Sequence, residues 1–561
     1  MIVYEKNVGN VSLTKNNYVA SGGEGSIYTK GSKAYKIYLD PKKTIPTDKM
    51  TDLSEITYDN VIRPLNLLTD KKNNPIGYSM RFVGKNHPLC QIFTKSFKNR
   101  FKIDEDTILS LVDIMEDTVR HIHSKDILIV DLNELNFLVS DDFKDVYFID
   151  VDSYQTKNYK ATAIMESIRD EHTKSFNEGS DWFSFAVVSF QMFLGIHPYK
   201  GKYLNSPTMP LNERKLANIS VFNKDVKIPR ICPPIESIPK NYRDWYFQVF
   251  EEGLREAPPK AKKYLDNKIT KYIHVLDITG DSKIDINLVK EYDSPIINYV
   301  ENKGGYSATQ TSKSIWYSSS VYPNMESSFL SISPKLNNLT ECYISSGYLN
   351  IKSLPKRELL YSSIKADDIM SYEGRVYVKS SESVYELVYS GNTENVISFN
   401  KVANVLDKAT RFYEGVVIQD LLGSYYASLF PDTGLSFQLG LPDLKGHKII
   451  DAKFDFRVLM VISFKEGRYL KTIYKLNSEY KITHKRTIED ISLISINFVT
   501  LPSGVTAHIQ EDGKLELFSL NNDQIKTISS DKISLDMRLF KRSNFVLFSK
   551  ENKMYRVKTK G

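Results

Sequence analysis

The sequence has few of the residues that build metal or disulfide frameworks. Its 561 residues include three cysteines and nine histidines. Cys90, Cys232 and Cys342 lie far apart, form no C-x-x-C pair and offer no basis for a disulfide framework. We therefore expect a reducing compartment, with the cytoplasm as the location.

The chain also has no apolar run long enough to cross a membrane. Residues 1–17 contain no apolar core of signal-peptide length. The longest nearly apolar run, FSFAVVSFQMFLGI at 183–196, is shorter than a transmembrane helix requires and includes polar residues. We expect a soluble protein without a membrane partner, in which this run forms a buried helix.

Basic residues are not concentrated in any one segment. The 75 lysines and arginines nearly balance the 68 aspartates and glutamates, which leaves a net charge of +7 without a Lys/Arg block. This pattern does not predict nucleic-acid binding. The length exceeds what one hydrophobic core supports, so two or three domains are expected.

The residue pattern changes near residue 265. Before it, strand-like segments are mixed with three segments in which apolar residues repeat at helical spacing, namely 105–123, 181–196 and 241–256. After the APPKAKK stretch at 257–263, short β-branched and aromatic runs alternate with Gly, Asn, Asp and Ser. The fold class predicted is multidomain α+β, with a mixed domain over 1–265 and an all-β domain over 266–561.

The β region predicts a repeating architecture. Its strand-like runs cluster around centres spaced roughly 40 to 48 residues apart, as four-stranded propeller blades would be. The centres lie near Tyr377, Tyr425, Leu470, Leu515 and Tyr555. A six- or seven-bladed β-propeller-like domain is the preferred prediction. A pair of β-sandwiches is the alternative, because no W-D signature marks the repeats.

The tyrosine-rich strands of this region have two explanations. Tyrosine offers a large contact area at low entropic cost, which suits a recognition surface for a protein partner or substrate. Tyrosine is also favoured in strands that bind nothing. Both explanations stay open, and the first predicts a protein partner for the β domain.

Three acidic or amide side chains follow short apolar runs in the first half. Residues 127–136 read ILIVDLNELN and residues 146–154 read VYFIDVDSY. These runs place Asp131, Asn136 and Asp150 at strand ends, where ordinary turn chemistry would explain them. A site for a metal and a phosphate group is the other explanation.

A glycine-rich segment precedes these motifs. Residues 20–28 read ASGGEGSIY, and Lys36 follows on the next strand-like segment. Backbone N–H groups of such a hairpin can lie against phosphates, and a lysine on the next strand can reach them. A tight hairpin without a ligand is the simpler alternative.

The order of these motifs resembles the protein kinase family, in particular divergent bacterial and phage kinase-like proteins with the eukaryotic-type Ser/Thr kinase fold. HSKDILIVDLNELNFLV is similar to a kinase catalytic loop, and FIDVD is similar to the D-F-G segment. SDWFSFAVVSFQMFLGIHPYKG is similar to the kinase helix that opens with a buried aspartate, here Asp181. The resemblance covers about residues 15–265. It implies a bilobal domain with an N-lobe over 1–83 and a C-lobe over 84–265.

The resemblance also implies site residues. Asp131 would be the catalytic aspartate, Lys36 would bind the ATP phosphates as a second catalytic residue, and Asn136 and Asp150 would hold magnesium. ATP and Mg²⁺ are therefore the implied cofactors. The remaining ATP-binding positions lie in the glycine segment and at the hinge beside the adenine: Gly22, Gly23, Gly25, Ile27, Arg81 and Val83. Asp181 would hold backbone amides of the catalytic loop, and the aromatic residues after it are expected in the core.

Several positions depart from the family pattern. Ala20 replaces the first glycine, Ile129-Val130 replace His-Arg, and Asn133 replaces a lysine. Without an arginine at 130, activation through a loop phosphate is not expected. The glycine of D-F-G is Asp152, either an extra metal ligand or, as we prefer, a solvated turn residue.

The carboxylate partner of Lys36 is not identifiable from the sequence. Asp48, Asp52 and Glu55 lie in a plausible helix, and none of the three stands out.

The predicted activity is ATP- and Mg-dependent phosphoryl transfer to Ser or Thr hydroxyls of a protein, with the β domain recruiting substrate or partner. The alternative is a pseudokinase or scaffold that binds nucleotide or partners without transfer. A small-molecule kinase of the aminoglycoside or choline type shares the lobes, but it would not predict the propeller-like tail.

Overall fold

The computed structural model describes residues 1–161, 164–229, 231–259, 284–324, 328–333, 338–354, 356–361, 363–389, 397–492, 494–521, 524–530, 533–543 and 545–559. The described residues form two compact units, one built mainly from residues 1–259 and the other mainly from residues 284–559. The predicted domain boundary near residue 265 lies outside the described residues and stays a prediction. Each unit is described by itself below.

The first unit begins with a seven-stranded sheet in the order β2-β1-β6-β7-β5-β4-β3, and its paired strands run antiparallel. One short helix, α1 (Thr47–Leu53), interrupts the strand sequence between β5 and β6. The strands are β1 (Ile2–Glu5), β2 (Gly9–Ser12), β3 (Tyr18–Ser21), β4 (Gly25–Lys30), β5 (Lys33–Tyr38), β6 (Pro64–Thr69) and β7 (Pro75–Arg81).

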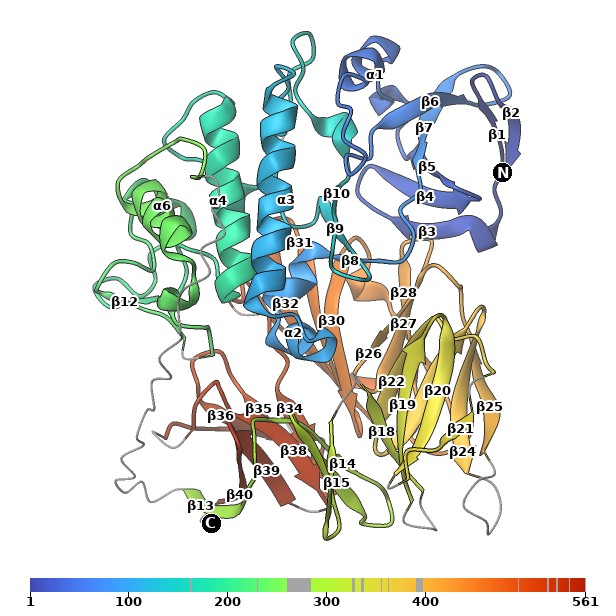
Figure 1. Cartoon of the computed structure of the whole chain (residues 1–561), viewed down its shortest axis with the longest axis vertical. Helices are drawn as coiled ribbons and strands as arrows, with labels where there is room; N and C mark the ends of the chain where they lie inside the picture. The colour runs from blue at the N-terminus through green and yellow to red at the C-terminus, as the bar shows by residue number, and fades with distance from the viewer. Residues whose placement is uncertain are drawn as a thin grey trace. The chain divides into compact units, whose positions relative to one another are not determined.

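The rest of the first unit is mainly helical (Figure 1). Its helices are α2 (Lys95–Phe101), α3 (Glu105–His123), α4 (Glu178–Leu194), α5 (Leu211–Leu216) and α6 (Lys240–Glu251). A small sheet of β8 (Asn86–Pro88), β9 (Phe137–Ser140) and β10 (Val146–Phe148) accompanies them, with the short pair β11 (Lys202–Tyr203) and β12 (Val226–Lys227). The three predicted helices are confirmed, because they correspond to α3, α4 and α6.

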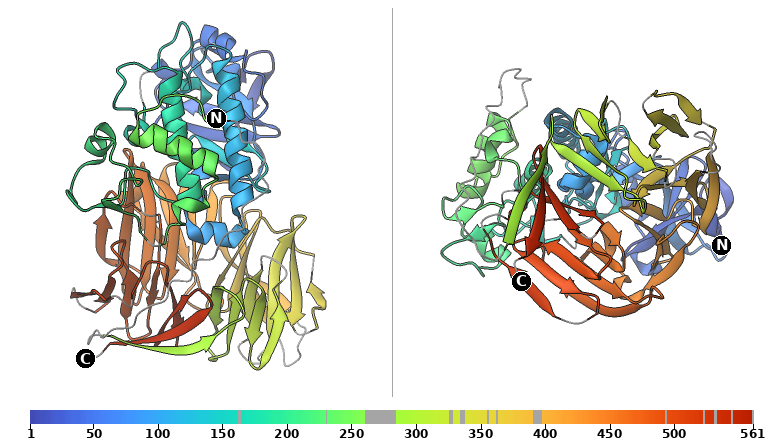
Figure 2. Two further views of the ribbon diagram at one scale, coloured as in Figure 1. Left: turned by 60° about the vertical axis from the view of Figure 1, so that its left-hand side comes forward. Right: turned by 90° about the horizontal axis from the view of Figure 1, so that it is seen from below.

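The core of this helical part is α4. Every residue from Ser180 to Leu194 is buried. A helix buried on all sides has apolar residues on all its faces, which explains the long, nearly apolar run in the sequence. The helix packs against α3, which lies beside it in Figures 1 and 2, and against α6. The prediction of a buried helix is confirmed. The aromatic residues expected in the core are buried as well: Trp182, Phe183, Phe185 and Phe190.

None of the helices in the described ranges is long and apolar enough to cross a membrane.

The described residues of the second unit form seven four-stranded antiparallel sheets. Six of them use four consecutive strands each. They are β14 (Ile296–Glu301), β15 (Ser307–Thr311), β16 (Ser314–Tyr317) and β17 (Ser320–Pro323); β18 (Phe329–Ile332), β19 (Leu339–Ser345), β20 (Tyr348–Leu354) and β21 (Leu359–Tyr361); β22 (Asp368–Tyr372), β23 (Arg375–Ser380), β24 (Ser383–Tyr389) and β25 (Ile397–Asn404); β26 (Thr410–Tyr413), β27 (Val416–Leu421), β28 (Ser424–Leu429) and β29 (Phe437–Leu441); β30 (Lys448–Asp455), β31 (Val458–Lys465), β32 (Arg468–Leu476) and β33 (Ile482–Ile488); and β34 (Phe498–Thr500), β35 (Val505–Ile509), β36 (Leu515–Ser519) and β37 (Ile525–Ile528).

The seventh sheet joins the two ends of the unit. The first described strand, β13 (Ile284–Glu291), pairs with the last one, β40 (Lys553–Thr559), beside β39 (Phe545–Lys550) and β38 (Arg538–Arg542). Figure 2 shows the green β13 next to the red β40. The leading strands of neighbouring sheets touch in the pairs β18 and β22, β22 and β26, β26 and β30, and β34 and β38, and β14 contacts both β18 and β38. The described strands therefore form a succession of small four-stranded sheets, the last of which includes strands from both ends of the unit, and not the two packed sheets of a sandwich.

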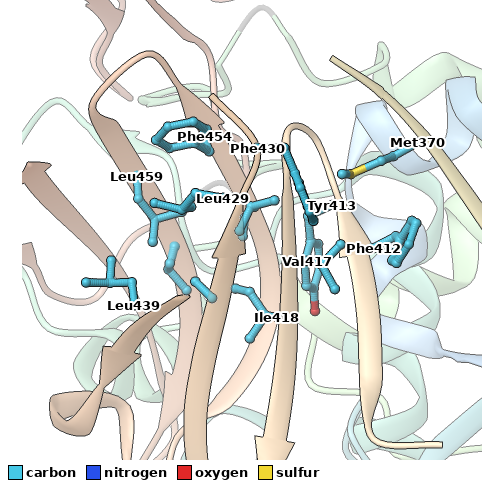
Figure 3. Close-up of a cluster of buried hydrophobic side chains, with 14 of the residues drawn as sticks. Met370, Phe412, Tyr413, Val417, Ile418, Leu429, Phe430, Leu439, Phe454 and Leu459 are labelled. Atoms are coloured by element: carbon cyan, nitrogen blue, oxygen red, sulfur yellow. The ribbon is translucent and has the colours of Figure 1, made fainter. Parts of the chain in front are cut away.

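The cores of this unit lie between neighbouring sheets. The cluster of Figure 3 includes Phe412 and Val417 of one sheet and Phe454 and Leu459 of the next, and all four are buried. Burial of both faces explains long apolar runs such as VLMVISF in β31. All five predicted strand centres lie in this unit, each in a different sheet.

Candidate functional site

A buried lysine and two aspartates form an ionic cluster in the first unit. Lys36 Nζ on β5 donates to Asp150 Oδ1 at 2.7 Å and to Asp152 Oδ2 and Oδ1 at 2.8 and 3.0 Å. Glu24 Oε2 lies 3.5 Å from the same ammonium group. Lys36 and Asp150 are 114 residues apart in sequence, so the fold brings together two residues that the motifs predicted to cooperate.

The charges of this cluster determine its protonation. Burial disfavours the charged form of Lys36, but the carboxylates of Asp152 and Asp150 outweigh it and raise the lysine pKa. Burial, together with the charge of Asp152, raises the pKa of Asp150 to about 6. For Asp152, Lys36 outweighs burial and the pKa is lowered. The site therefore holds one cation between two carboxylates of different acidity.

Asp152 is the best-connected member of the cluster. Tyr38 OH and Tyr78 OH both donate to its carboxylate, the latter at 2.7 Å. Lys49 Nζ of α1 donates to its backbone carbonyl at 2.7 Å. The preferred interpretation of Asp152 as a solvated turn residue is wrong, because its side chain is only 5% exposed.

The sequence left the carboxylate partner of Lys36 open, and none of the three candidates at 48–55 pairs with it in the structure. The partners are Asp150, Asp152 and Glu24, and Asp52 of α1 instead accepts from Thr156 Oγ1 at 2.7 Å.

Strand geometry explains why these side chains meet. Lys36 and Tyr38 lie two residues apart on β5 and therefore point to the same face of the sheet. Tyr78 on β7 pairs directly with Lys36 in the register of the sheet. On the other side, Asp150 precedes a 3₁₀ turn (Val151–Ser153) and has a left-handed backbone with φ 61°. This conformation allows Asp150 and Asp152, two residues apart, to direct their carboxylates to the ammonium group of Lys36.

The predicted catalytic loop lies beside this turn. Leu128 and Gln155 exchange two backbone hydrogen bonds of 3.0 and 2.9 Å, and Ile149 N donates to Asn136 O at 2.9 Å. These bonds hold the segment that contains Asp131 against the segment that contains Asp150. The predicted residues of both motifs therefore lie in one region of the unit.

Within the loop, Asp131 and Asn136 contact each other. Asn136 Nδ2 donates to Asp131 O at 2.9 Å and to Asp131 Oδ2 at 3.3 Å, while Met165 N donates to Asp131 Oδ1 at 2.8 Å. Burial raises the pKa of Asp131, only partly offset by these bonds. Asn133 is buried, and its side chain accepts from Leu135 N, so it stiffens the loop and brings no cation.

Asp181 anchors the loop from α4. Its two carboxylate oxygens accept from Ile129 N at 2.8 Å and Val130 N at 2.9 Å, and His123 Nε2 lies 2.9 Å from Oδ2. The expectation that Asp181 holds loop amides is confirmed. Val130 has φ 65°, an unfavourable region for a β-branched residue, so the loop is strained where Asp181 holds it.

The glycine segment has two different kinds of glycine. A Cβ on Gly25 would lie 2.6 Å from the carbonyl oxygen of Ile37 on the paired strand, so packing requires a glycine there. A Cβ on Gly22 or Gly23 would have no neighbour within 4 Å, and neither residue has a left-handed backbone. Packing therefore does not explain Gly22 and Gly23. Ile27 follows on β4, paired with Lys36.

The predicted hinge residues do not join the ionic cluster. Arg81 Nη2 donates to Asp59 O, and its guanidinium lies 5.6 Å from the centre of the Tyr147 ring. Val83 is buried, and its carbonyl accepts from Asn86 Nδ2 at 3.4 Å. Their role beside an adenine stays a prediction.

The cluster has donors for a divalent cation. Carboxylate oxygens of Glu24, Asp150 and Asp152 all lie within 4.8 Å of one another. Such oxygens suit a hard cation such as Mg²⁺, so the residues present fit the implied metal. Asn136 is joined to this region by its backbone, although its side-chain amide is bonded to Asp131.

Sequence reasoning missed Tyr38, Tyr78 and Lys49. Tyr38 could have been found from its i+2 spacing to Lys36. Tyr78 and Lys49 could not, because their contacts depend on strand register and helix placement.

No protein-family model matches the chain, and no curated protein is significantly similar in sequence. Two solved structures to which part of the chain is similar are Hsv2 of Kluyveromyces lactis and Hsv2 of Kluyveromyces marxianus, each 12% identical. The first match covers 48% of this chain and 98% of that chain with a TM-score of 0.30; the second covers 46% and 89% with a TM-score of 0.29. At these scores the likeness supports no functional comparison.

Proposed function

We propose that the first unit is a protein kinase-like domain that transfers the γ-phosphate of ATP to Ser or Thr hydroxyls of a protein. We further propose that the second unit is a seven-bladed β-propeller that recruits the substrate or a partner. The observation that supports the kinase proposal most directly is the 2.7 Å contact between Lys36 Nζ and Asp150 Oδ1. The neighbouring Asp131–Asn136 loop adds the other predicted residues.

The residues have distinct tasks in this proposal. Lys36 orients the α and β phosphates, and Asn136 and Asp150 hold Mg²⁺, which neutralises phosphate charge when bound. Asp131 accepts a hydrogen bond from the acceptor hydroxyl and takes its proton as transfer proceeds. The raised pKa of Asp131 makes its carboxylate a stronger base for this step.

A nucleotide-binding pseudokinase is the second candidate, and Asn133 favours it. In the kinase template a lysine stands at this position, whereas Asn133 is buried and bonded to loop backbone. The transferring phosphate would then lack one neutralising cation. The two candidates differ in whether phosphoryl transfer occurs and whether it depends on Asp131.

Single-turnover phosphorylation of the protein itself or of cell-lysate proteins tests the proposal, with Mg·ATP binding measured separately. We expect Asp131→Asn to lower the transfer rate by roughly 10²–10⁴-fold with ATP affinity nearly unchanged, because Asp131 meets the acceptor and not the nucleotide. Asp126→Asn is the matched control, since Asp126 is exposed and its left-handed backbone suits asparagine. Binding of Mg·ATP without any Asp131-dependent transfer would leave the pseudokinase candidate.

A further inference from the structure

We propose that Asp152 is the carboxylate that positions Lys36, and that it is not a ligand of the metal held by its neighbour Asp150. This inference rests on the proposed function. It gives Asp152 a role in positioning Lys36 that the sequence motifs did not predict. Three features of the cluster lead to it: the saturation of the Asp152 carboxylate, the exposure of Asp150, and the contact made by Lys49.

The Asp152 carboxylate has no acceptor capacity left. Oδ1 accepts from Lys36 Nζ and Tyr78 OH, and Oδ2 accepts from Lys36 Nζ and Tyr38 OH. A carboxylate has about four acceptor positions, and these four bonds use them. Its side chain is 5% exposed, so a metal could reach it only by displacing the lysine or a tyrosine.

Asp150 is different, although it is only two residues away. Its side chain is 33% exposed, and within the described residues its one hydrogen-bond donor is Lys36, at Oδ1. Its second oxygen is therefore available to a cation. Glu24, at 56% exposure and 3.5 Å from Lys36, is also accessible. The three grouped carboxylates thus separate into one anchor and two groups open to a metal.

A buried lysine needs a permanent counter-charge, because desolvation of an unpaired ammonium group is costly. Once Asp150 turns toward a metal, Lys36 would lose one of its partners. Asp152 keeps the ammonium group in place through that change, since Tyr38 and Tyr78 hold the Asp152 side chain from the sheet.

Helix α1 supports this anchor through a cation. Lys49 Nζ donates to the Asp152 carbonyl at 2.7 Å, and Lys49 is 8% exposed. Asp52 on the same helix is bonded to Thr156 and does not reach Lys36. Helix α1 therefore holds the turn that carries Asp152 through Lys49, and it does not supply a carboxylate to Lys36.

The test compares Asp152→Asn with Asp150→Asn, with Asp52→Asn as a matched control on α1. The measurements are the single-turnover phosphorylation rate at saturating ATP and, independently of activity, the Mg²⁺ midpoint, defined as the Mg²⁺ concentration that gives half of the thermal stabilisation by ATP. We expect Asp150→Asn to raise that Mg²⁺ midpoint by about tenfold or more. Asp152→Asn should leave the midpoint unchanged and lower the maximal rate by about 100-fold, the effect of a misplacement of about 1 Å. Asp52→Asn should match the wild type in both.

Two results would overturn the inference: a Mg²⁺ midpoint raised in Asp152→Asn as in Asp150→Asn, or a wild-type rate in Asp152→Asn. A wild-type protein that neither binds nor transfers from Mg·ATP would refute the proposed function itself. If Asp152→Asn does not fold, Tyr78→Phe decides, because it removes a single bond to Asp152. A reduced rate at an unchanged midpoint supports the anchor, and a wild-type rate overturns it.

Discussion

The two kinds of glycine in the segment 20–28 make a sharp prediction. In Gly25→Ala the new Cβ would lie 2.6 Å from Ile37 O, which belongs to the backbone of the paired strand β5. The strands must separate by several tenths of an ångström. Overpacking of this kind costs about 1–3 kcal/mol. Alanine recovers about 0.4–1 kcal/mol by reducing the entropy of the unfolded chain.

We therefore expect Gly25→Ala to lower the free energy of unfolding of the first unit by about 1–2 kcal/mol. Gly22→Ala is the matched control, because its Cβ meets no atom within 4 Å and its backbone is not left-handed. It should unfold at the wild-type temperature or slightly above. Thermal unfolding of both variants without nucleotide measures this difference.

For nucleotide binding, Gly22→Ala is the variant expected to show an effect. If backbone amides of the segment lie against the phosphates, a Cβ at Gly22 intrudes on that approach, and ATP affinity should fall by about tenfold, or about 1.4 kcal/mol. The shift of the unfolding temperature by Mg·ATP reports it. Wild-type affinity in Gly22→Ala would refute the phosphate-binding interpretation. Wild-type stability in Gly25→Ala would refute the packing argument.

Two predictions concern the second unit. Lys541 Nζ lies 3.0 Å from Glu373 Oε1 and 2.7 Å from Asp455 Oδ1. Lys541→Met should cost about 3–5 kcal/mol in urea unfolding, because the buried Asp455 carboxylate loses its cation, while Glu373 keeps Arg375 at 3.4 Å. A loss below about 1 kcal/mol would contradict this. Burial lowers the pKa of His508, whose Nδ1 lies 3.2 Å from Glu516 Oε2, to about 4. In the unfolded chain this histidine takes up its proton near pH 6.5. The free energy of unfolding is therefore unaffected by His508 above that pH and falls by about 3 kcal/mol toward pH 4. His508→Gln should remove that part of the pH dependence of unfolding.

The helices were predictable because their signals are local. Helix α3 covers the predicted residues 105–123, and its N-cap Asp104 accepts from Thr107 N at 2.9 Å. Helix α4 begins at Glu178, earlier than predicted, because Asn177 caps it with Ser180. It ends at Leu194 because Gly195 adopts a left-handed backbone, a stop signal inside the predicted range.

The strand clusters were only partly predictable, because some strands bury polar residues. The sheet of β14–β17 produced no predicted centre. Its strand β15 reads SATQT and is buried at its last four positions. Thr311 there accepts from Ser294 Oγ at 2.8 Å and donates to Ser314 O at 3.0 Å. Hydrogen bonds satisfy these buried groups, so the apolar alternation that marks a strand is missing.

The site was predictable as a set of motifs but not as a geometry. Asp131, Asn136, Asp150 and Lys36 were chosen from order and spacing, and the fold places them in one region. The neighbours that decide their roles come from long-range contacts. Tyr78 meets the cluster only because β7 pairs with β5 in one register.

The pair Asp150 and Asp152 shows how such contacts assign opposite chemistry to residues of one type. Burial and a neighbouring charge raise the pKa of Asp150 to about 6, while Lys36 and two tyrosines lower that of Asp152. A departure from a motif is therefore not in itself a sign of a degraded site. In the proposed kinase-like site, Asp152 stands at the position of the D-F-G glycine and is the partner of Lys36 that neither Asp48 nor Asp52 of α1 provides.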